Sequence, residues 1–287
     1  MKKCAVFLFG VLAFNGGIAS AQDRELPPGW FAGPMNGKLG NHATITVPEG
    51  YLFLNKDATR KFLEENQNVP DGDELGTLLR VLPDEKHWFA VFSYADTGHI
   101  DNSDRNSLDA DKLMESMRQG NYESNEERKK RGWAPLFLID WQVKPYYDQK
   151  TDNLTWATLL TSDNEPVINH SVRLLGRTGL MSAQLVADPA VIEVATEEFN
   201  QALNGYTFTP GRRYAEFTSG DKLAGYGLTA LIAGGAGAAA VKTGVFKKFG
   251  KLIAVAFVGL IALLKKLLSA FGNKTENAEP TPSTHSS

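Results

Sequence analysis

The stretch LFLIDWQVKPYYDQKTDNLTWATLLTSDNEPVINHSVRLLGRTGLMSAQLV, residues 136–186, decides the fold class. Turn-forming residues such as Asp, Asn, Gly and Ser divide it into short runs that are rich in apolar, β-branched and aromatic side chains. No helical pattern separates these runs, which disfavours a parallel sheet. The stretch therefore predicts an antiparallel meander with strands at residues 136–147, 154–161, 167–175 and 179–186.

The rest of residues 42–220 mixes strands and helices. Alternation predicts strands at 42–47, 51–54 and 88–94, with short closing strands at 206–209 and 214–217. Helical spacing predicts helices at 57–66, 110–119, 122–131 and 189–203. The first two strands are expected to form a hairpin, and Asp57 is expected to cap the first helix. Residues 22–41, rich in Pro and Gly, are expected to form a tether.

The fold class expected from this order is α+β, with one antiparallel sheet and covering helices, then a C-terminal transmembrane helix and a short second apolar helix. The transmembrane helix is predicted over residues 221–246. A helix needs about 20 apolar residues to cross the hydrocarbon layer, and no charged residue interrupts 223–241. Small residues recur at the spacing that lets helices pack closely in lipid, at Ala230, Gly234 and Ala238 and at Ala233 and Gly237.

The second apolar segment, residues 247–272, is flanked by lysines on both sides. Its apolar part, residues 252–264, would cover about 20 Å as a helix, which is short for a span. We expect it to lie on the inner leaflet. A second crossing, with snorkelling lysines, is the alternative. Residues 273–287 are expected to be a disordered tail.

Residues 1–21 have the pattern of a secretory signal peptide, with Lys2 and Lys3, an apolar core and a small-residue cleavage site. Cys4 is the only cysteine. Cleavage would leave no cysteine, which excludes disulfides, thiolate metal sites and cysteine nucleophiles.

Residues 22–222 hold 31 acidic and 21 basic residues, a net charge of −10, whereas 223–274 hold seven lysines and no acidic residue. This asymmetry disfavours nucleic-acid binding and favours contact of the tail with an anionic leaflet.

No residue is assigned as catalytic, cofactor-binding or metal-ligating. The aspartates of the acidic loop, residues 99–111, fit no calcium-loop spacing. We therefore expect Asp109 to cap the next helix and the other aspartates to be solvated. A site for a hard cation is the alternative. The histidines are isolated in sequence. Four aromatic residues in adjoining predicted strands could form one face, namely Trp141, Tyr146, Tyr147 and Trp156. We expect this face to pack in the core, and a ligand groove is the alternative.

Several motifs carry a family resemblance. They include ATITVPEGY (43–51), WFAVFSYADTG (88–98), RLLGRTGLMS (173–182) and GRRYAEFTSGDKLAGYGLTALIAGGAGAAAVKTG (211–244). Residues 33–244 resemble an uncharacterised membrane-anchored bacterial family, domain of unknown function 2167. The part beyond Gly250 is expected to be particular to this chain. The resemblance implies an envelope protein anchored by a C-terminal helix, and it implies no activity.

The sequence thus predicts a bacterial inner-membrane protein with its main domain in the periplasm and its C-terminus in the cytoplasm. Its expected function is non-enzymatic binding. A tethered hydrolase-like enzyme, with a site assembled from distant His, Asp and Glu residues, is the alternative. The expected partners are the bilayer and, through the small-residue helix, a second copy or another envelope protein. Arg212 and Arg213 are candidate contacts for lipid headgroups or a partner carboxylate, with ordinary surface arginines as the alternative.

Overall fold

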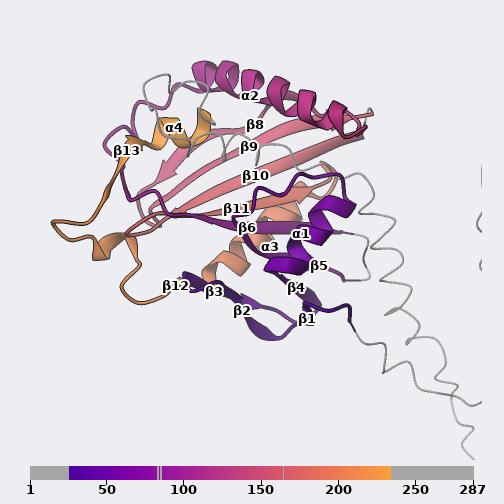
Figure 1. The fold of residues 1–287 in the computed structure, drawn as a ribbon, viewed down its shortest axis with the longest axis horizontal. Helices are drawn as coiled ribbons and strands as arrows, with labels where there is room; N and C mark the ends of the chain where they lie inside the picture. The colour runs from indigo at the N-terminus through magenta and orange to yellow at the C-terminus, as the bar shows by residue number, and fades with distance from the viewer. Residues whose placement is uncertain (1–25, 83, 85, 164, 234–287) are drawn as a thin grey trace, which may run out of the picture.

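The computed structural model describes residues 26–82, 84, 86–163 and 165–233. Its main body is an eight-stranded antiparallel sheet in the order β1-β4-β5-β6-β11-β10-β9-β8 (Figure 1). These strands are β1 (Trp30–Ala32), β4 (Tyr51–Asn55), β5 (Glu74–Arg80), β6 (Trp88–Ala95), β8 (Phe137–Asp148), β9 (Asn153–Ser162), β10 (Glu165–Leu175) and β11 (Leu180–Ala187). The α+β class and the antiparallel sheet are confirmed.

The predicted meander is confirmed as β8, β9, β10 and β11, each paired antiparallel with the next. The strand predicted at 88–94 is β6, which lies beside β11 in the interior of the sheet. The sequence analysis missed β5, because its residues ELGTLLR (74–80) are buried on both faces and do not alternate. A strand buried in this way gives no period-two signal.

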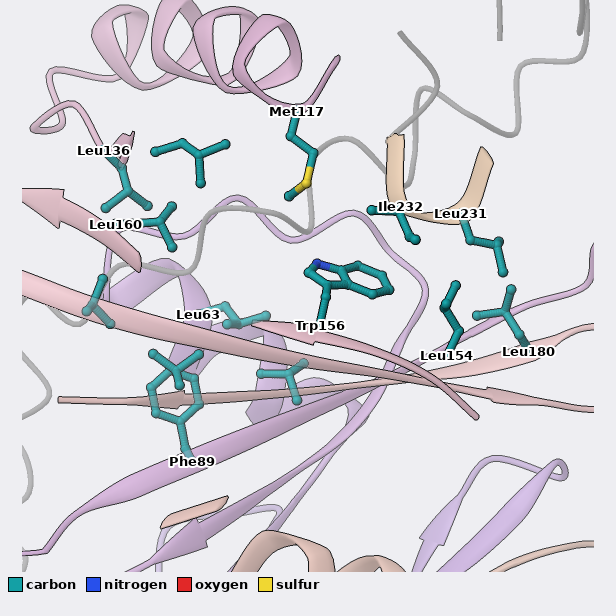
Figure 2. Close-up of a cluster of buried hydrophobic side chains, with 14 of the residues drawn as sticks. Leu63, Phe89, Met117, Leu136, Leu154, Trp156, Leu160, Leu180, Leu231 and Ile232 are labelled. Carbon is teal, nitrogen blue, oxygen red and sulfur yellow. The ribbon is translucent and has the colours of Figure 1, made fainter. Parts of the chain in front are cut away.

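One face of the sheet is covered by α1 (Lys56–Glu65), α2 (Ala110–Lys130) and α4 (Leu228–Ala233). The core on this face contains Trp156 of β9, and Figure 2 shows Met117 of α2 and Ile232 of α4 pointing toward its indole ring. Arg173 is buried in the same region, with its guanidinium carbon 4.7 Å from the centre of the Trp156 ring. Burial lowers the pKa of Arg173 to about 10.

The opposite face is covered by α3 (Ile192–Asn204) and by a small antiparallel sheet in the order β12-β3-β2 (Figure 1). The strands of this sheet are β2 (Met35–Leu39), β3 (Ala43–Val47) and β12 (Tyr206–Phe208). The hairpin expected from residues 42–54 is therefore wrong. After the turn at residues 48–50 the chain changes sheets, so β3 pairs with β2 and β12 while β4 joins the main sheet.

The tether expected over residues 22–41 is not what the described part of that segment forms. β1 pairs with β4, and β2 pairs with β3. Leu39 at the end of β2 is fully buried, and a side chain at Gly37 would collide with the ring of Phe53. Glycine is therefore needed where β2 crosses the main sheet, and its presence was misread as a sign of irregular structure.

The helix ends agree in part with the sequence. Asp109 caps α2 as predicted, its Oδ1 accepting from the Lys112 amide at 3.2 Å. For α1 the cap is Asn55 rather than Asp57, with Asn55 Oδ1 accepting from the Ala58 amide at 3.0 Å. The two helices predicted at 110–119 and 122–131 form one continuous helix, and residues 214–216 form a short 3₁₀ helix (Tyr214–Glu216) instead of a strand.

The predicted transmembrane helix does not begin at residue 221. Residues 223–227 form β13 (Leu223–Gly227), which pairs in parallel with β7 (His99–Asp101). The next residues form α4, whose Leu228, Leu231 and Ile232 are buried in the core. Within the described residues no helix has both the length and the apolar character needed to cross a bilayer. The predictions for residues 1–21 and 234–287 concern parts of the chain outside the described residues.

A groove between α3 and the meander

The candidate site lies where α3 leaves part of the meander uncovered. A row of paired residues crosses the sheet on the α3 side, from Leu185 of β11 through His170 of β10 and Ala157 of β9 to Val143 of β8. Leu185 is fully buried, whereas Val143 is 36 % exposed. The buried side of α3, which includes Phe199, therefore covers the β11 end of the row and leaves the β8 end open.

This open region, called here the α3 groove, consists of two adjoining hollows. Their volumes are about 630 and 580 Å³. Asn200 and Asn204 of α3 line both, so the two hollows form one continuous groove. Its lining also includes Gln142, Tyr146, Thr155, His170, Gln201 and Tyr206.

His170 forms the floor of the first hollow. Its side chain is 5 % exposed and packs edge-on against Phe199, with ring centroids 6.2 Å apart. Burial lowers the pKa of His170 to about 4, so the imidazole is neutral at pH 7. Its ring makes no hydrogen bond to another residue in the described part of the chain. A neutral imidazole has one donor and one acceptor nitrogen, so His170 can offer a donor or an acceptor to a ligand in the groove, according to its tautomer.

The second hollow is lined by tyrosines and by the turn between β8 and β9. The side chain of Tyr146 is 49 % exposed. The hydroxyl of Tyr206 is buried and has no hydrogen-bond partner among the described residues. Burial raises the pKa of Tyr206 far above its usual range, which keeps this hydroxyl protonated. The second hollow therefore offers one accessible aromatic ring, that of Tyr146, whereas the Tyr206 hydroxyl lies beneath its surface.

The acidic groups of the second hollow are already engaged. Asp152 Oδ1 accepts from the Tyr147 hydroxyl at 2.8 Å. Asp148 accepts from the Lys150 amide and the Thr151 hydroxyl, both at 2.9 Å. These carboxylates stabilise the β8–β9 turn, which sits at one end of the groove.

The wall made by β8 is irregular. β8 is the edge strand of the main sheet, and its pairing with β9 shifts register between Leu138 and Asp140, between Trp141 and Val143 and between Val143 and Tyr146. Each shift interrupts the regular row of hydrogen-bonding groups at the free edge. Such irregularity protects an edge strand from pairing with another chain.

The aromatic face predicted from the sequence is divided between the two sides of the sheet. Trp141, Tyr147 and Trp156 contribute to the core on the α2 side. The indole Nε1 of Trp141 donates to the carbonyl of Ala110 in α2 at 3.1 Å. Tyr146 alone lines the groove. Tyr146 and Tyr147 are adjacent in β8, so their side chains point to opposite faces of the sheet.

Arg212 and Arg213 are both held by the domain. Arg212 Nη1 lies 3.3 Å from His42 Nδ1, and its carbonyl accepts from the Arg177 amide at 2.9 Å. The Arg213 amide donates to Glu216 Oε2 at 2.8 Å, and Arg213 also lines the second hollow. The structure thus brings Arg213, but not Arg212, into the candidate site.

Of the small residues predicted to pack in the membrane, Ala230 is half-buried within α4 and Ala233 ends it. Gly234, Gly237 and Ala238 lie outside the described residues.

In the acidic loop, Asp104 is not simply solvated. It accepts hydrogen bonds from the Leu228 and Thr229 amides, both at 3.0 Å, and so caps α4. No group of three or more His, Cys, Asp or Glu residues in the described ranges is arranged to hold a metal ion.

The structure is an α+β domain with an open groove on one face of its main sheet. The chain belongs to the family described as protein of unknown function (DUF2167), whose profile matches residues 32–265. The match includes residues 252–264, so the second apolar segment is part of the family pattern and the expectation that it is particular to this chain is wrong.

Among curated proteins, none matches this sequence. Among solved structures, the chain is similar to cyanobacterial PsbP (CyanoP) from Synechocystis sp. PCC 6803, determined in solution. The TM-score is 0.37 and the sequence identity 10 %, over 69 % of this chain and 99 % of that one. Similarity at this level supports no argument about function.

Proposed function

We propose that this chain is a non-enzymatic binding protein of the bacterial envelope, anchored in the inner membrane, that takes its ligand in the α3 groove. The observation that carries the binding role is the continuous groove, which is lined by the half-exposed ring of Tyr146 and by the amides of Asn200 and Asn204. Concave surfaces with a few convergent polar groups are the usual places for ligands. The polar side chains of the groove include several amides and hydroxyls beside the ring of Tyr146, and these are groups that bind and orient a ligand.

The anchoring role rests on sequence. Residues 234–246, which follow α4, would cover only about 20 Å as a helix, so the proposed crossing also uses residues 252–264, the second apolar segment between lysines. With the signal peptide at residues 1–21, this order would export residues 26–233 and retain the C-terminal end at the inner membrane. Close packing of the small residues Gly234, Gly237 and Ala238 against a second copy or another envelope protein is part of the proposal.

Site-specific photo-crosslinking in native membranes tests the binding role. Benzoylphenylalanine replaces Tyr146 in the groove and, as the matched control, Tyr122, which is 65 % exposed on α2. We expect a specific crosslinked product from position 146 and none of the same mass from position 122. Identical products from both positions, or no product from position 146, would refute a binding role for the groove.

Cysteine labelling tests the topology. Because Cys4 is the only cysteine and lies in the signal peptide, Tyr122→Cys and a cysteine added after Ser287 each provide a single labelling site. We expect a membrane-impermeant maleimide to label Tyr122→Cys in cells with a permeabilised outer membrane, and the C-terminal cysteine only after lysis. The chain should also float with vesicles in a density gradient. Failure to float, or labelling of both cysteines before lysis, would refute the anchored topology.

A further inference from the structure

The chemistry of the α3 groove narrows the class of ligand. Amide side chains recur along it, at Gln142 on β8 and at Asn200, Gln201 and Asn204 on α3. Each amide has two donor hydrogens and an acceptor oxygen, so it can bind a hydroxyl or another amide with either role. A ligand that meets this groove along its length must therefore present many small neutral groups that both donate and accept.

The aromatic group of the groove is placed to receive an apolar ring face. Tyr146 is half exposed on β8, and it pairs across the sheet with Thr155, which lines the same hollow. An aromatic ring flanked by hydroxyl and amide groups matches a molecule with an apolar face and a polar rim. A pyranose ring has this character, since its axial C–H groups form a face and its hydroxyls form the edge.

The charged side chains that line the groove are acidic except for Arg213. Glu193 and Glu197 lie exposed on the α3 side, where they would repel a polyanion but accept hydrogen bonds from hydroxyls. Asp148 and Asp152 keep their negative charge while they accept hydrogen bonds within the β8–β9 turn, so they add to the repulsion of a polyanion. An extended peptide would bind by adding to β8, and the register shifts in β8 interrupt the hydrogen-bonding row it would need.

We propose that the α3 groove binds a neutral glycan chain, with a sugar ring stacked on Tyr146 and with sugar hydroxyl or acetamido groups on Asn200, Asn204 and His170. This inference rests on the proposed binding function of the groove. The shared residues Asn200 and Asn204 connect the two hollows, so a chain of several sugars can occupy both. The neutral ring of His170 can donate to a sugar oxygen or accept from a sugar hydroxyl, according to its tautomer.

Calorimetric titration of the full chain with neutral hexasaccharides tests the inference. The probes are chitohexaose, cellohexaose and maltohexaose, and co-sedimentation with purified cell-wall sacculi forms a separate arm. We expect saturable binding of at least one hexasaccharide, weakened about tenfold by Tyr146→Ala or Asn200→Ala, as expected from loss of one stacking or hydrogen-bonding group. Tyr122→Ala on α2 should leave the affinity unchanged.

Tyr146→Phe keeps the ring and Asn200→Asp keeps the shape, so these variants separate lost binding from misfolding. Tyr146→Phe should bind almost as well as the native chain, and Asn200→Asp should bind less well. Co-sedimentation with sacculi would identify the cell wall as the source, whereas hexasaccharide binding without it would indicate another envelope polysaccharide. Both outcomes support a glycan.

Absence of binding to every hexasaccharide and to sacculi would overturn the inference, as would binding that Tyr146→Ala and Asn200→Ala leave unchanged. A protein captured from position 146 together with no glycan binding would overturn the glycan but leave the binding role of the groove standing. Absence of both a crosslinked product and glycan binding would overturn both.

Discussion

Asp104 joins two parts of the chain that are 124 residues apart in sequence. Its Oδ1 accepts from the Leu228 amide at 3.0 Å, and its Oδ2 accepts from the Thr229 amide at 3.0 Å and the Thr229 hydroxyl at 2.8 Å. Asp104→Ala would leave the first turn of α4 uncapped. Loss of an N-cap costs about 1 kcal/mol, and loss of the hydroxyl contact adds a similar amount, so we expect a destabilisation of about 2 kcal/mol.

For a domain of this size, such a loss lowers the unfolding temperature by about 4–8 °C. Differential scanning calorimetry of the full chain measures it, and hydrogen exchange should show faster exchange at the Leu228 and Thr229 amides. Asp104→Asn keeps one acceptor oxygen and should lose about half as much. Glu123→Ala, an exposed change on α2, is the control and should stay within roughly 0.5 kcal/mol. An unfolding temperature for Asp104→Ala equal to that of Glu123→Ala would show that α4 is not held by this cap.

Three further predictions concern buried groups. Ile232 is fully buried, so Ile232→Ala should lower the free energy of unfolding, measured with denaturant, by about 2–4 kcal/mol. Leu223 is 61 % exposed, so Leu223→Ala should lower it by less than roughly 0.5 kcal/mol, and equal losses would contradict the docking of α4. Burial, reinforced by the charge of Glu74, raises the pKa of Asp71 to about 7. The contribution of Asp71 to the free energy of unfolding is present at pH 4 and is lost as the pH rises to 7. Asp71→Asn should therefore reduce the loss of stability between pH 4 and pH 7, and an unchanged pH profile would contradict the burial of Asp71. The pKa of His170 is instead lowered, so its contribution to the free energy of unfolding is present above pH 6.5 and is lost as the pH falls toward 4. His170→Gln should remove this loss of stability at acid pH. An unchanged dependence of stability on pH between 6.5 and 4 would contradict a buried neutral imidazole.

The parts of the fold that the sequence predicted are those set by neighbouring residues. The four strands of the meander follow from local alternation and from turn residues between them, and the Asp109 cap follows from its place before α2. Each depends on contacts within a few residues or on the adjacent strand. Such contacts leave a direct pattern in the sequence.

The errors occurred where the partner is distant. β3 bonds to β12 more than 150 residues later, and β13 bonds to β7 more than 100 residues earlier. An apolar segment of Leu, Ala and Gly fits both a membrane helix and a buried helix, and only the tertiary contacts of Leu228 and Ile232 separate the two over residues 228–233. Propensity alone does not make that distinction.

The groove could not be predicted from the sequence for a related reason. His170 lies in a buried strand among apolar residues, where a histidine is usually a core residue. Its access to the groove depends on how far α3 extends across the sheet. The only sequence signal was the polar side of α3, with Glu197, Asn200, Gln201 and Asn204, and an exposed helix face in any domain has the same composition.

The docking of α4 has a practical consequence for handling the protein. Since Leu228, Leu231 and Ile232 complete the core, a version truncated before Leu223 would expose the surfaces of Met117 and Trp156 that they cover. Reporter fusions or proteolytic cuts near residue 222 would therefore be expected to yield aggregates even if the rest of the domain is intact. A boundary just after Ala233 keeps the core whole and leaves out the remaining apolar residues, and is the place to end a fragment intended for crystallisation.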